Sequence, residues 1–430
     1  MVEKVNKYNF YIIQDGISVS KSFEKQFRNS FGYEDFKEFD NKLITNFVGF
    51  IINEENIIIS FPKHFFNEEE IESLNYYQEE NLKKIKYYMK LLFNNIRKSS
   101  LDKSIASIGL NKEINENYPM KAFFDIYEYY KKFGLFYNEE KESKFGLSGK
   151  INWNKTIKKS PIILSKRNII YSPFVVDKNK NNTVFISECM AYAINSTIDK
   201  LSIFLNLDKI DYKYKEINWE NRNKIVVHLR EELNKTFKDS QRKLILNLID
   251  FFNHENVGNK TIKLSIKTFN LVWEKILENY LENYFEEMDE DGFLMFNDIK
   301  NSERKSFKKG SLIVDMKSTG TNYKLEPDYY YVSEGYKLIL DAKYYNEIKG
   351  LNYKQASYYF LSKHDQVKIN ETIKTYNLLL LPTEREMDDE KNKRTHFLFN
   401  SIYNRDEMNT DMKISEQYFQ IKYLMELYLK

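Results

Sequence analysis

The sequence of 430 residues is poor in several residue types, and each shortage excludes a class of protein. A single cysteine, Cys189, excludes an intramolecular disulfide framework and any zinc site built from cysteines. The five histidines are scattered without HExxH or HxxxH spacing, so we do not expect a zinc enzyme. The sequence has no run of 18 apolar residues, and its N-terminus carries charges too early for a signal peptide. We therefore expect a cytoplasmic protein that makes no membrane contact.

Charge of one sign is also scarce. The chain has 66 basic and 63 acidic residues, a net charge of only +3, so bulk electrostatics do not indicate a nucleic-acid partner. Any DNA binding must rest on local sites. Hydrophobic residues make up 42% of the chain and recur periodically, which is typical of a folded protein with two or three domains.

The periodic segments predict a multidomain α+β protein. Residues 1–105 read as a β-rich N-terminal domain followed by a helix, and Asn53–Asn56 separates two strand-like runs as a hairpin loop. Residues 106–255 read as a mixed, mainly helical middle domain that binds a partner or DNA. Residues 256–430 read as an α/β domain with a mixed central sheet flanked by helices. The helices are expected at 68–98, 119–133, 184–205, 219–254, 265–287 and from about Ser415 onward.

One segment of the C-terminal domain brings charged residues together. Two apolar runs flank Glu334-Gly335, which predicts a hairpin with a two-residue turn in which glycine supplies a positive φ. In that register residue i pairs with residue 669 minus i, so Asp328 lies opposite Asp341. Lys343 is two residues further along the strand and shares the same face. The alternative is a surface hairpin with ordinary charges.

Two carboxylates at this separation repel each other, and a divalent cation removes the conflict. Carboxylate oxygens suit Mg²⁺, which can polarise a phosphodiester and activate a bound water molecule. A lysine beside them can orient that water or stabilise charge on the phosphate. Asp328 and Asp341 are therefore candidate metal ligands, and Lys343 is a candidate catalytic residue.

Pro327-Asp328 followed by Asp341-Ala342-Lys343 resembles the motif of the PD-(D/E)xK nucleases. The resemblance implies an α/β nuclease fold and hydrolysis of DNA phosphodiesters with Mg²⁺. The segment around Trp273 and Glu274 resembles the nuclease-domain helix of McrC proteins, which implies a catalytic role for Glu274; the alternative is a solvated glutamate. Gln355 and Tyr359 resemble a QxxxY motif of related nucleases and share a helix face, so both are candidate site residues. Tyr359 can equally be a core residue.

The resemblance continues upstream. The run from Phe47 to His64 resembles the N-terminal region of McrC-like proteins, and the segment 149–157 is similar to part of the LlaJI restriction-enzyme family. This implies a bacterial restriction subunit that acts on double-stranded DNA in phage defence with a McrB-like AAA+ GTPase partner. Two alternatives stay open: a self-contained restriction endonuclease that reads its own site, and an adaptor that stimulates a partner NTPase.

Basic residues outside this constellation are weaker candidates. Arg304, Lys305, Lys308 and Lys309 precede the hairpin and are candidate DNA contacts. The basic run from Lys150 to Arg167 contains Trp153 and can follow a phosphate backbone, or it is a solvated face. Gly146–Ile151 lacks the spacing of a phosphate-binding loop, and Ile151 stands where the hydroxyl residue is needed, so we expect no nucleotide site in this chain.

Overall fold

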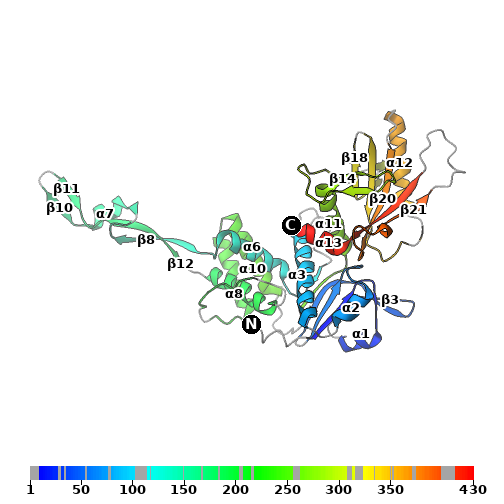
Figure 1. Ribbon diagram of the computed structural model, residues 1–430. Helices are drawn as coiled ribbons and strands as arrows, with labels where there is room; N and C mark the ends of the chain where they lie inside the picture. Colours follow the sequence, from blue (N-terminus) through cyan, green and yellow to red (C-terminus); the bar gives the residue numbers. More distant parts are fainter. Residues whose placement is uncertain are drawn as a thin grey trace. The chain divides into compact units, whose positions relative to one another are not determined.

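The computed structural model describes most of the chain in separate stretches. These are residues 9–27, 31–32, 35–53, 56–75, 79–101, 114–116, 118–148, 150–165, 168–182, 185–202, 207–214, 217–254, 262–307, 312–314, 323–333, 335–348, 350, 353–369, 374–398 and 412–430. The chain folds into two compact units (Figure 1). The first contains residues 1–116 and 260–430, and the second contains residues 117–259.

The first unit contains an N-terminal sheet, in the order β1-β6-β5-β13-β7. Its strands are β1 (Asn9–Gln14), β6 (Asn56–Phe61), β5 (Val48–Ile52), β13 (Ile262–Ile266) and β7 (Ile114–Glu116). β5 and β6 form the predicted antiparallel hairpin, in which Ile52 pairs with Ile57. Both strands are rich in the β-branched residues Val and Ile. They are almost fully buried, since helices cover both faces of the sheet. Phe27 of α1 (Lys21–Phe27) packs on one face, and Phe93 of α3 (Glu79–Leu101) contacts Phe50 on the other.

β13 follows the middle unit in the sequence and is an interior strand of this sheet, between β5 and β7. It pairs antiparallel with β5, with Ser265 opposite Gly49. Gly49 has φ +144°, and a Cβ there would lie 2.0 Å from the carbonyl oxygen of Leu264. Only glycine lets the two backbones approach this closely. The segment before residue 269, which the sequence placed partly in a helix of the C-terminal domain, is therefore a strand of the N-terminal sheet.

The C-terminal sheet has the order β18-β19-β20-β22-β21 and mixes parallel and antiparallel pairs, as expected from the sequence. Its strands are β18 (Tyr329–Val332), β19 (Tyr336–Ala342), β20 (Lys374–Thr383), β22 (Lys413–Gln420) and β21 (Lys393–Leu398). α12 (Tyr353–Ile369) covers one face, where Tyr359 packs on Leu379 and Leu381. α11 (Phe269–Tyr284) lies on the other face, where Tyr280 contacts Phe419.

The remaining elements of the first unit are short or peripheral. They are β2 (Ser18–Val19), β3 (Phe36–Phe39), β4 (Lys42–Thr45), α2 (Glu68–Asn75), β14 (Phe285–Met288), β15 (Leu294–Phe296), β16 (Leu312–Val314), β17 (Tyr323–Leu325), a 3-10 turn at Glu390–Asn392 and α13 (Ile421–Leu429). α3 packs against α13, and Asn95 Nδ2 donates a hydrogen bond to the carbonyl of Met425 at 3.1 Å. This hydrogen bond joins the N-terminal segment of the first unit, at α3, to its C-terminal helix α13.

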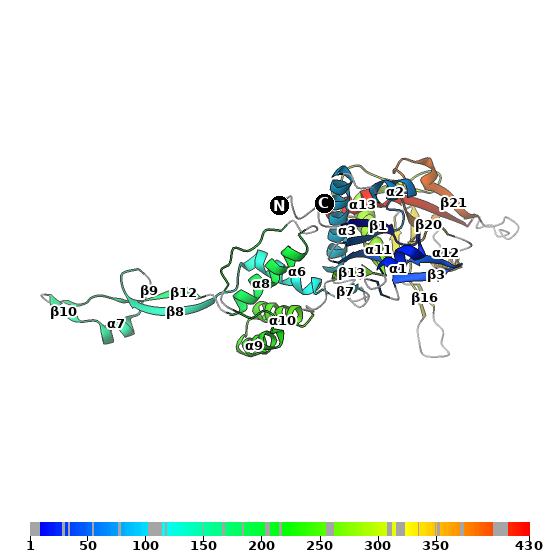
Figure 2. The ribbon, with the colours of Figure 1, turned by 90° about the horizontal axis from the view of Figure 1, so that it is seen from below.

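The second unit has a helical part and an extended arm, which both views show (Figures 1 and 2). The helices are α6 (Met120–Phe133), α8 (Phe185–Lys200), α9 (Arg222–Lys235) and α10 (Asp239–His254). The arm contains β8 (Asn138–Phe145), β9 (Lys150–Ile151), α7 (Trp153–Lys159), β10 (Ile162–Ser165), β11 (Asn168–Tyr171) and β12 (Val175–Asn182). β8 pairs with β12 along its length, and β10 pairs with β11 at the far end.

Several sequence expectations need correction. The helix expected from Ser415 begins only at Ile421, because residues 413–420 form the buried strand β22. The helix expected at 68–98 is two helices, α2 and α3, and the helical block expected at 219–254 consists of α9 and α10. The expected domains, 1–105, 106–255 and 256–430, are grouped differently here, because the pairing of β13 with β5 joins the first and last into one compact unit.

No helix in the described part of the chain is both long enough and apolar enough to cross a membrane.

Candidate active site

The hairpin at the edge of the C-terminal sheet has the predicted register. Tyr329 pairs with Leu340 and Val332 with Lys337, so paired residue numbers sum to 669. The backbone N–H of Ser333 donates to the carbonyl of Tyr336 at 2.9 Å and continues the ladder toward the turn. Gly335 does not have the positive φ that the sequence led us to expect, although the register is as predicted. The predicted turn geometry was therefore wrong at Gly335, and the predicted pairing is confirmed.

Asp328 lies just before the first paired residue of β18. Its Oδ2 accepts a hydrogen bond from the backbone N–H of Ala342 at 2.8 Å, which ties it to the end of β19. Burial raises the pKa of the Asp328 carboxyl, and the negative charges of Asp341 and Glu274 raise it further, to about 7. The Ala342 N–H and the Lys343 ammonium act in the opposite direction but do not outweigh these effects. Three carboxyl groups therefore influence one another at this edge of the sheet.

Asp341 is the most buried of these carboxylates, with 1% of its surface exposed. It lies on the face of β19 that α12 covers, because Lys337, four residues earlier, donates to Ser362 of α12 at 3.0 Å. Asp341 Oδ2 forms an ion pair with Lys343 Nζ. No hydrogen-bond donor within the described ranges reaches its Oδ1. A buried carboxylate oxygen without a donor is costly, so this atom is available to a cation.

Lys343 follows the last residue of β19. Its backbone N–H donates to the carbonyl of Leu380 on the neighbouring strand β20 at 2.8 Å. This bond holds the main chain in an extended course, so the side chain returns to the face of Asp341. The pair Asp341 and Lys343 is thus brought together by strand geometry, as the two-residue spacing predicted.

Glu274 approaches from α11 on the opposite side of the hairpin. The helix is fixed by buried Val272, Trp273, Ile276 and Leu277. The Tyr329 hydroxyl donates to the backbone carbonyl of Glu274 at 2.5 Å, so β18 and α11 meet at this residue. The charge of Glu274 acts on Asp328. The helix therefore carries this carboxylate to the same end of the sheet, the position implied by the resemblance to the nuclease-domain helix.

Gln355 and Tyr359 lie on the sheet side of α12. Gln355 is fully buried, and its Nε2 donates to Asn377 Oδ1 and, at 3.3 Å, to the carbonyl of Ile339. Tyr359 is buried in an apolar cluster with Leu379 and Ile414. Tyr359 thus occupies the position that the core alternative predicted. Gln355 anchors the first turn of α12 to β19 two residues before Asp341.

Two neighbours on α12 were missed by sequence reasoning. Lys354 Nζ lies 5.5 Å from the ring centroid of Tyr358, and the two side chains are hydrogen-bonded. The Tyr358 hydroxyl donates to the carbonyl of Glu326 at 2.7 Å, just before Pro327. Their spacing of four residues was the available signal, since it places Lys354 and Tyr358 on one helix face. The presence of a lysine next to Gln355 does not by itself indicate a site residue.

The segment after Lys343 is held by residues near the N-terminal sheet. The backbone N–H of Lys63 donates to the Tyr344 hydroxyl at 2.8 Å, and Asn346 Nδ2 donates to the carbonyl of Gly16 at 2.9 Å. Asp15 also hydrogen-bonds to Tyr344, and burial raises the pKa of its carboxyl. The residue that follows the candidate catalytic lysine is therefore fixed by the other sheet of the first unit.

The residues present fit a hard divalent cation. Asp328 and Asp341 supply carboxylate oxygens, and the free Oδ1 of Asp341 together with the raised pKa of Asp328 indicates uncompensated negative charge. Across the residues that the structure describes, no group of three or more His, Cys, Asp or Glu side chains is arranged as a complete metal cage. A cation that keeps several water molecules, as Mg²⁺ does, suits such a sparse donor set.

The basic candidates that precede the hairpin contact the protein itself. Arg304 forms an ion pair with Glu282, and Lys305 Nζ lies 4.5 Å from the ring centroid of Phe285. Lys308 and Lys309 lie outside the described residues. Their role as DNA contacts stays a prediction.

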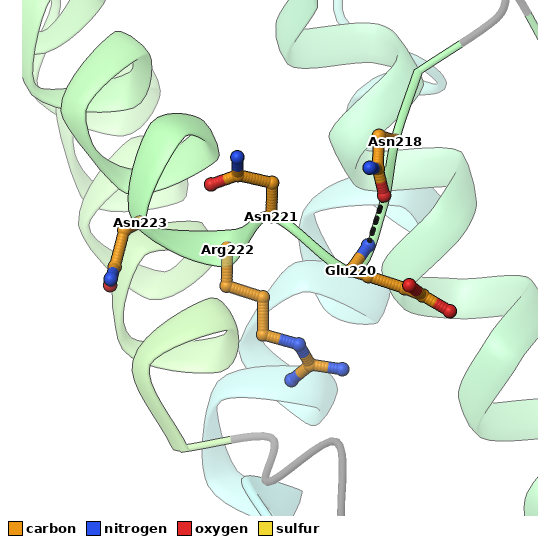
Figure 3. A pocket seen from close by; sticks show the side chains of 5 residues that line it. All are labelled: Asn218, Glu220, Asn221, Arg222 and Asn223. Atoms are coloured by element: carbon orange, nitrogen blue, oxygen red, sulfur yellow. Dashed lines mark hydrogen bonds between the residues drawn. The ribbon is translucent and has the colours of Figure 1, made fainter.

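A separate hollow of about 360 Å³ opens on the second unit (Figure 3). It is lined by Asn218, Glu220, Asn221, Arg222 and Asn223 at the start of α9. The backbone N–H of Glu220 donates to Asn218 Oδ1 at 3.0 Å, and Asn221 caps α9. Asn218 and Asn221 accept hydrogen bonds from backbone N–H groups of the loop and of the first turn of α9. None of the residues that line the hollow belongs to the carboxylate site.

A protein-family model described as LlaJI restriction endonuclease matches residues 47–408, which include the β18–β19 hairpin and every strand of the two sheets except β1 and β22. A comparison with curated proteins gave no match. Among solved structures, the chain is similar to a chain of an assembly of Thermococcus gammatolerans McrB AAA+ hexamers with bound McrC. The identity is 12%, the match covers 98% of both chains, and the TM-score is 0.39. A chain of the Thermococcus gammatolerans McrBC complex matches 64% of this chain and 89% of its own length, at 12% identity and a TM-score of 0.24.

Proposed function

Because the chain belongs to the LlaJI restriction endonuclease family, we propose that it is the DNA-cutting subunit of a restriction system, with a PD-(D/E)xK site. The observation that carries the proposal is the end of the β18–β19 hairpin. There Asp328 and Asp341 converge, Lys343 pairs with Asp341, and Glu274 acts on Asp328 from α11. A structural hairpin has no need of three mutually repelling carboxyl groups at one buried end.

Each side chain has a role that follows from its position. Asp328 and Asp341 hold the cation, and Glu274 adds negative charge that favours its binding. Bound Mg²⁺ supplies polarisation of the phosphodiester and lowers the pKa of a water molecule. With the cation present, Asp341 no longer needs Lys343 as its counter-charge. Lys343 then orients the attacking water or stabilises the charge that develops on the phosphate.

The arm of the second unit has a surface that suits the binding of a protein partner. Its far end exposes large apolar side chains on both strands of the β10–β11 pair, including Leu164 with 77% of its surface exposed. The exposed set is Phe145, Leu147, Trp153, Ile157, Ile162, Ile163, Leu164, Ile169 and Ile170. Large apolar side chains exposed in this number on one arm are typical of a protein interface. We assign it to a McrB-like AAA+ GTPase, the partner that the family resemblance implies.

The test combines the purified chain, a McrB-like AAA+ GTPase, double-stranded DNA, Mg²⁺ and GTP, and omits each component in turn. We expect DNA cleavage that needs Mg²⁺, the partner and GTP, and that is lost in Lys343→Ala. Lys374→Ala is the matched control, because Lys374 is an exposed lysine at the opposite end of the same sheet.

Each component tests a different part of the proposal. Cleavage that survives in Lys343→Ala contradicts the active site. Efficient site-specific cleavage without partner and GTP contradicts the partner role and favours a self-contained endonuclease. Stimulation of the partner's GTPase without any cleavage favours an adaptor.

A further inference from the structure

The start of α12 is tied to both strands of the catalytic hairpin. Gln355 Nε2 donates to the carbonyl of Ile339 on β19, two residues before Asp341. Tyr358, which is fully buried, donates through its hydroxyl to the carbonyl of Glu326, two residues before Asp328. These two bonds fix the first turns of α12 beside the carboxylates. Any side chain on the exposed edge of this turn therefore lies at the rim of the site.

Lys354 is the residue on that edge. It is exposed, its Nζ lies 5.5 Å from the ring centroid of Tyr358, and it is hydrogen-bonded to that side chain. Partial desolvation lowers the pKa of Lys354, but the hydrogen bond to Tyr358 and the charges of Asp341 and Asp328 outweigh it and raise the pKa. The ammonium group is therefore positioned by the buried Tyr358 side chain, whose hydroxyl is bonded to the Glu326 carbonyl, and it lies within the field of both candidate metal ligands.

The two lysines of the site differ in what they can reach. Lys343 is largely buried and forms an ion pair with Asp341. Lys354 faces solvent, so its donors are open to a substrate that approaches from outside. A DNA strand brings its phosphate groups from the solvent side, and a positively charged group on that side lowers the cost of placing a phosphate beside two carboxylates.

We propose that Lys354 is a phosphate-binding residue of this site, which contacts the DNA backbone and positions the scissile region over Asp328 and Asp341. The proposal rests on the proposed nuclease function and adds the residue that receives the substrate. The buried Tyr358 acts through Lys354 and is a positioning residue. The contact is with a phosphate and carries no sequence information.

The experiment measures the affinity of the full-length chain for a linearised plasmid across a series of salt concentrations, in EDTA so that no cleavage occurs. Lys354→Ala should weaken binding several-fold and reduce the slope of log affinity against log salt by about 1, because one phosphate contact is lost. Lys354→Arg should keep most of the affinity and the full slope. In Mg²⁺ with the partner and GTP, Lys354→Ala should raise the KM for DNA more than it lowers kcat.

Lys374→Ala is the matched control. Lys374 also lies over a tyrosine ring, 4.7 Å from the centroid of Tyr376, but at the turn end of the sheet where Tyr336 pairs with Lys374. Its removal should leave the salt slope unchanged. Equal affinity and equal salt slope in Lys354→Ala and Lys374→Ala would overturn the proposal, as would wild-type protein that does not bind DNA.

The result can be separated from the nuclease proposal. If the chain binds DNA through Lys354 but no combination of Mg²⁺, partner and GTP leads to cleavage, the nuclease function fails and the phosphate contact stands. If cleavage depends on Lys343 but binding is indifferent to Lys354, the nuclease function stands and the phosphate contact fails.

Discussion

The two large sheets of the first unit each bury an aspartate paired with a lysine, Asp35 with Lys263 and Asp341 with Lys343, and they differ in the charges around that pair. In the N-terminal sheet, Lys263 on β13 donates to Asp35 at 2.5 Å, and the backbone N–H of Gly32 donates to the same carboxylate oxygen at 2.5 Å. Both donors reach Oδ2 of Asp35, while its Oδ1 has no hydrogen-bond partner among the described residues. In the C-terminal sheet, Asp341 and Asp328 lie at one end of a hairpin with more negative than positive charge around Asp328.

The difference separates a structural charge from a functional one. A buried ion pair with its own hydrogen bonds holds two elements together and needs nothing from outside. A carboxylate whose pKa is raised by burial and by neighbouring carboxylates, as at Asp328, is stabilised when a proton or a cation joins it. The C-terminal sheet also contains a satisfied charge, since buried Glu416 accepts from His396 at 2.6 Å and pairs with Arg394. Within the described part of this sheet, Glu416 is thus a satisfied charge, whereas Asp328 at the hairpin end is acted on by more negative than positive charge.

The strongest test of this contrast is Asp341→Asn. We expect cleavage to fall on the order of 10³-fold or more, because a ligand of the cation is lost. The melting temperature of the metal-free protein should stay the same or rise, because repulsion with Asp328 is removed. Cleavage assays and thermal unfolding in EDTA measure the two effects. A large loss of stability together with lost activity would place Asp341 among the structural charges.

The opposite outcome is expected for Lys263→Met in the N-terminal sheet. It leaves Asp35 buried without its cation, so the unfolding free energy should fall by about 3 kcal/mol or more. Protein that remains folded should keep its DNA cleavage per molecule. Chemical denaturation gives the stability, and the double variant Lys263→Met, Asp35→Leu is the control, which should recover part of the loss. Unchanged stability in the single variant would contradict a structural role for this pair.

A smaller effect should appear in the pH dependence of stability. The pKa of Asp328 is raised from 3.8 to about 7, so the folded state binds a proton more tightly than the unfolded chain. The stability contributed by that proton is complete below pH 3.8 and is lost as the pH rises through 7. Between pH 5 and 6.5 the wild-type protein in EDTA should lose about 2 kcal/mol relative to Asp328→Asn. Parallel stability curves for the two proteins would contradict this coupling.

The part of the site that the sequence predicted is the part fixed by local geometry. A short hairpin turn determines every pair along the two strands, so the positions of Asp328, Asp341 and Lys343 followed from residue numbers alone. The turn conformation of Gly335 did not matter to this result, because the register depends on which residues pair and not on one φ angle. The mixed sheet with flanking helices also followed from the order of the periodic segments.

The part that the sequence did not predict depends on contacts between distant segments. Nothing in the local sequence of residues 262–266 indicates that they pair with Val48–Ile52, because the whole middle unit separates the two segments in the sequence. The sequence predicted a terminal helix from about Ser415, but residues up to Gln420 belong to β22, and only their pairing and burial in the sheet distinguish them as a strand. Lys354 was missed because its position near the carboxylates depends on the hydrogen bonds by which Gln355 and Tyr358 anchor α12, and the sequence does not show these bonds.

The pairing of β7 with β13 has a consequence for how such proteins can change over evolution. Residues 117–259 leave the first unit after β7 and return just before β13, and these strands are neighbours, with Glu116 opposite Leu264. Paired Cα atoms on adjacent strands are about 5 Å apart, a gap that a turn of a few residues can close. The whole second unit is thus an insertion into a single hairpin. Another module could be inserted between the same two strands, so related chains can differ in this unit while they share the sheets of the first unit.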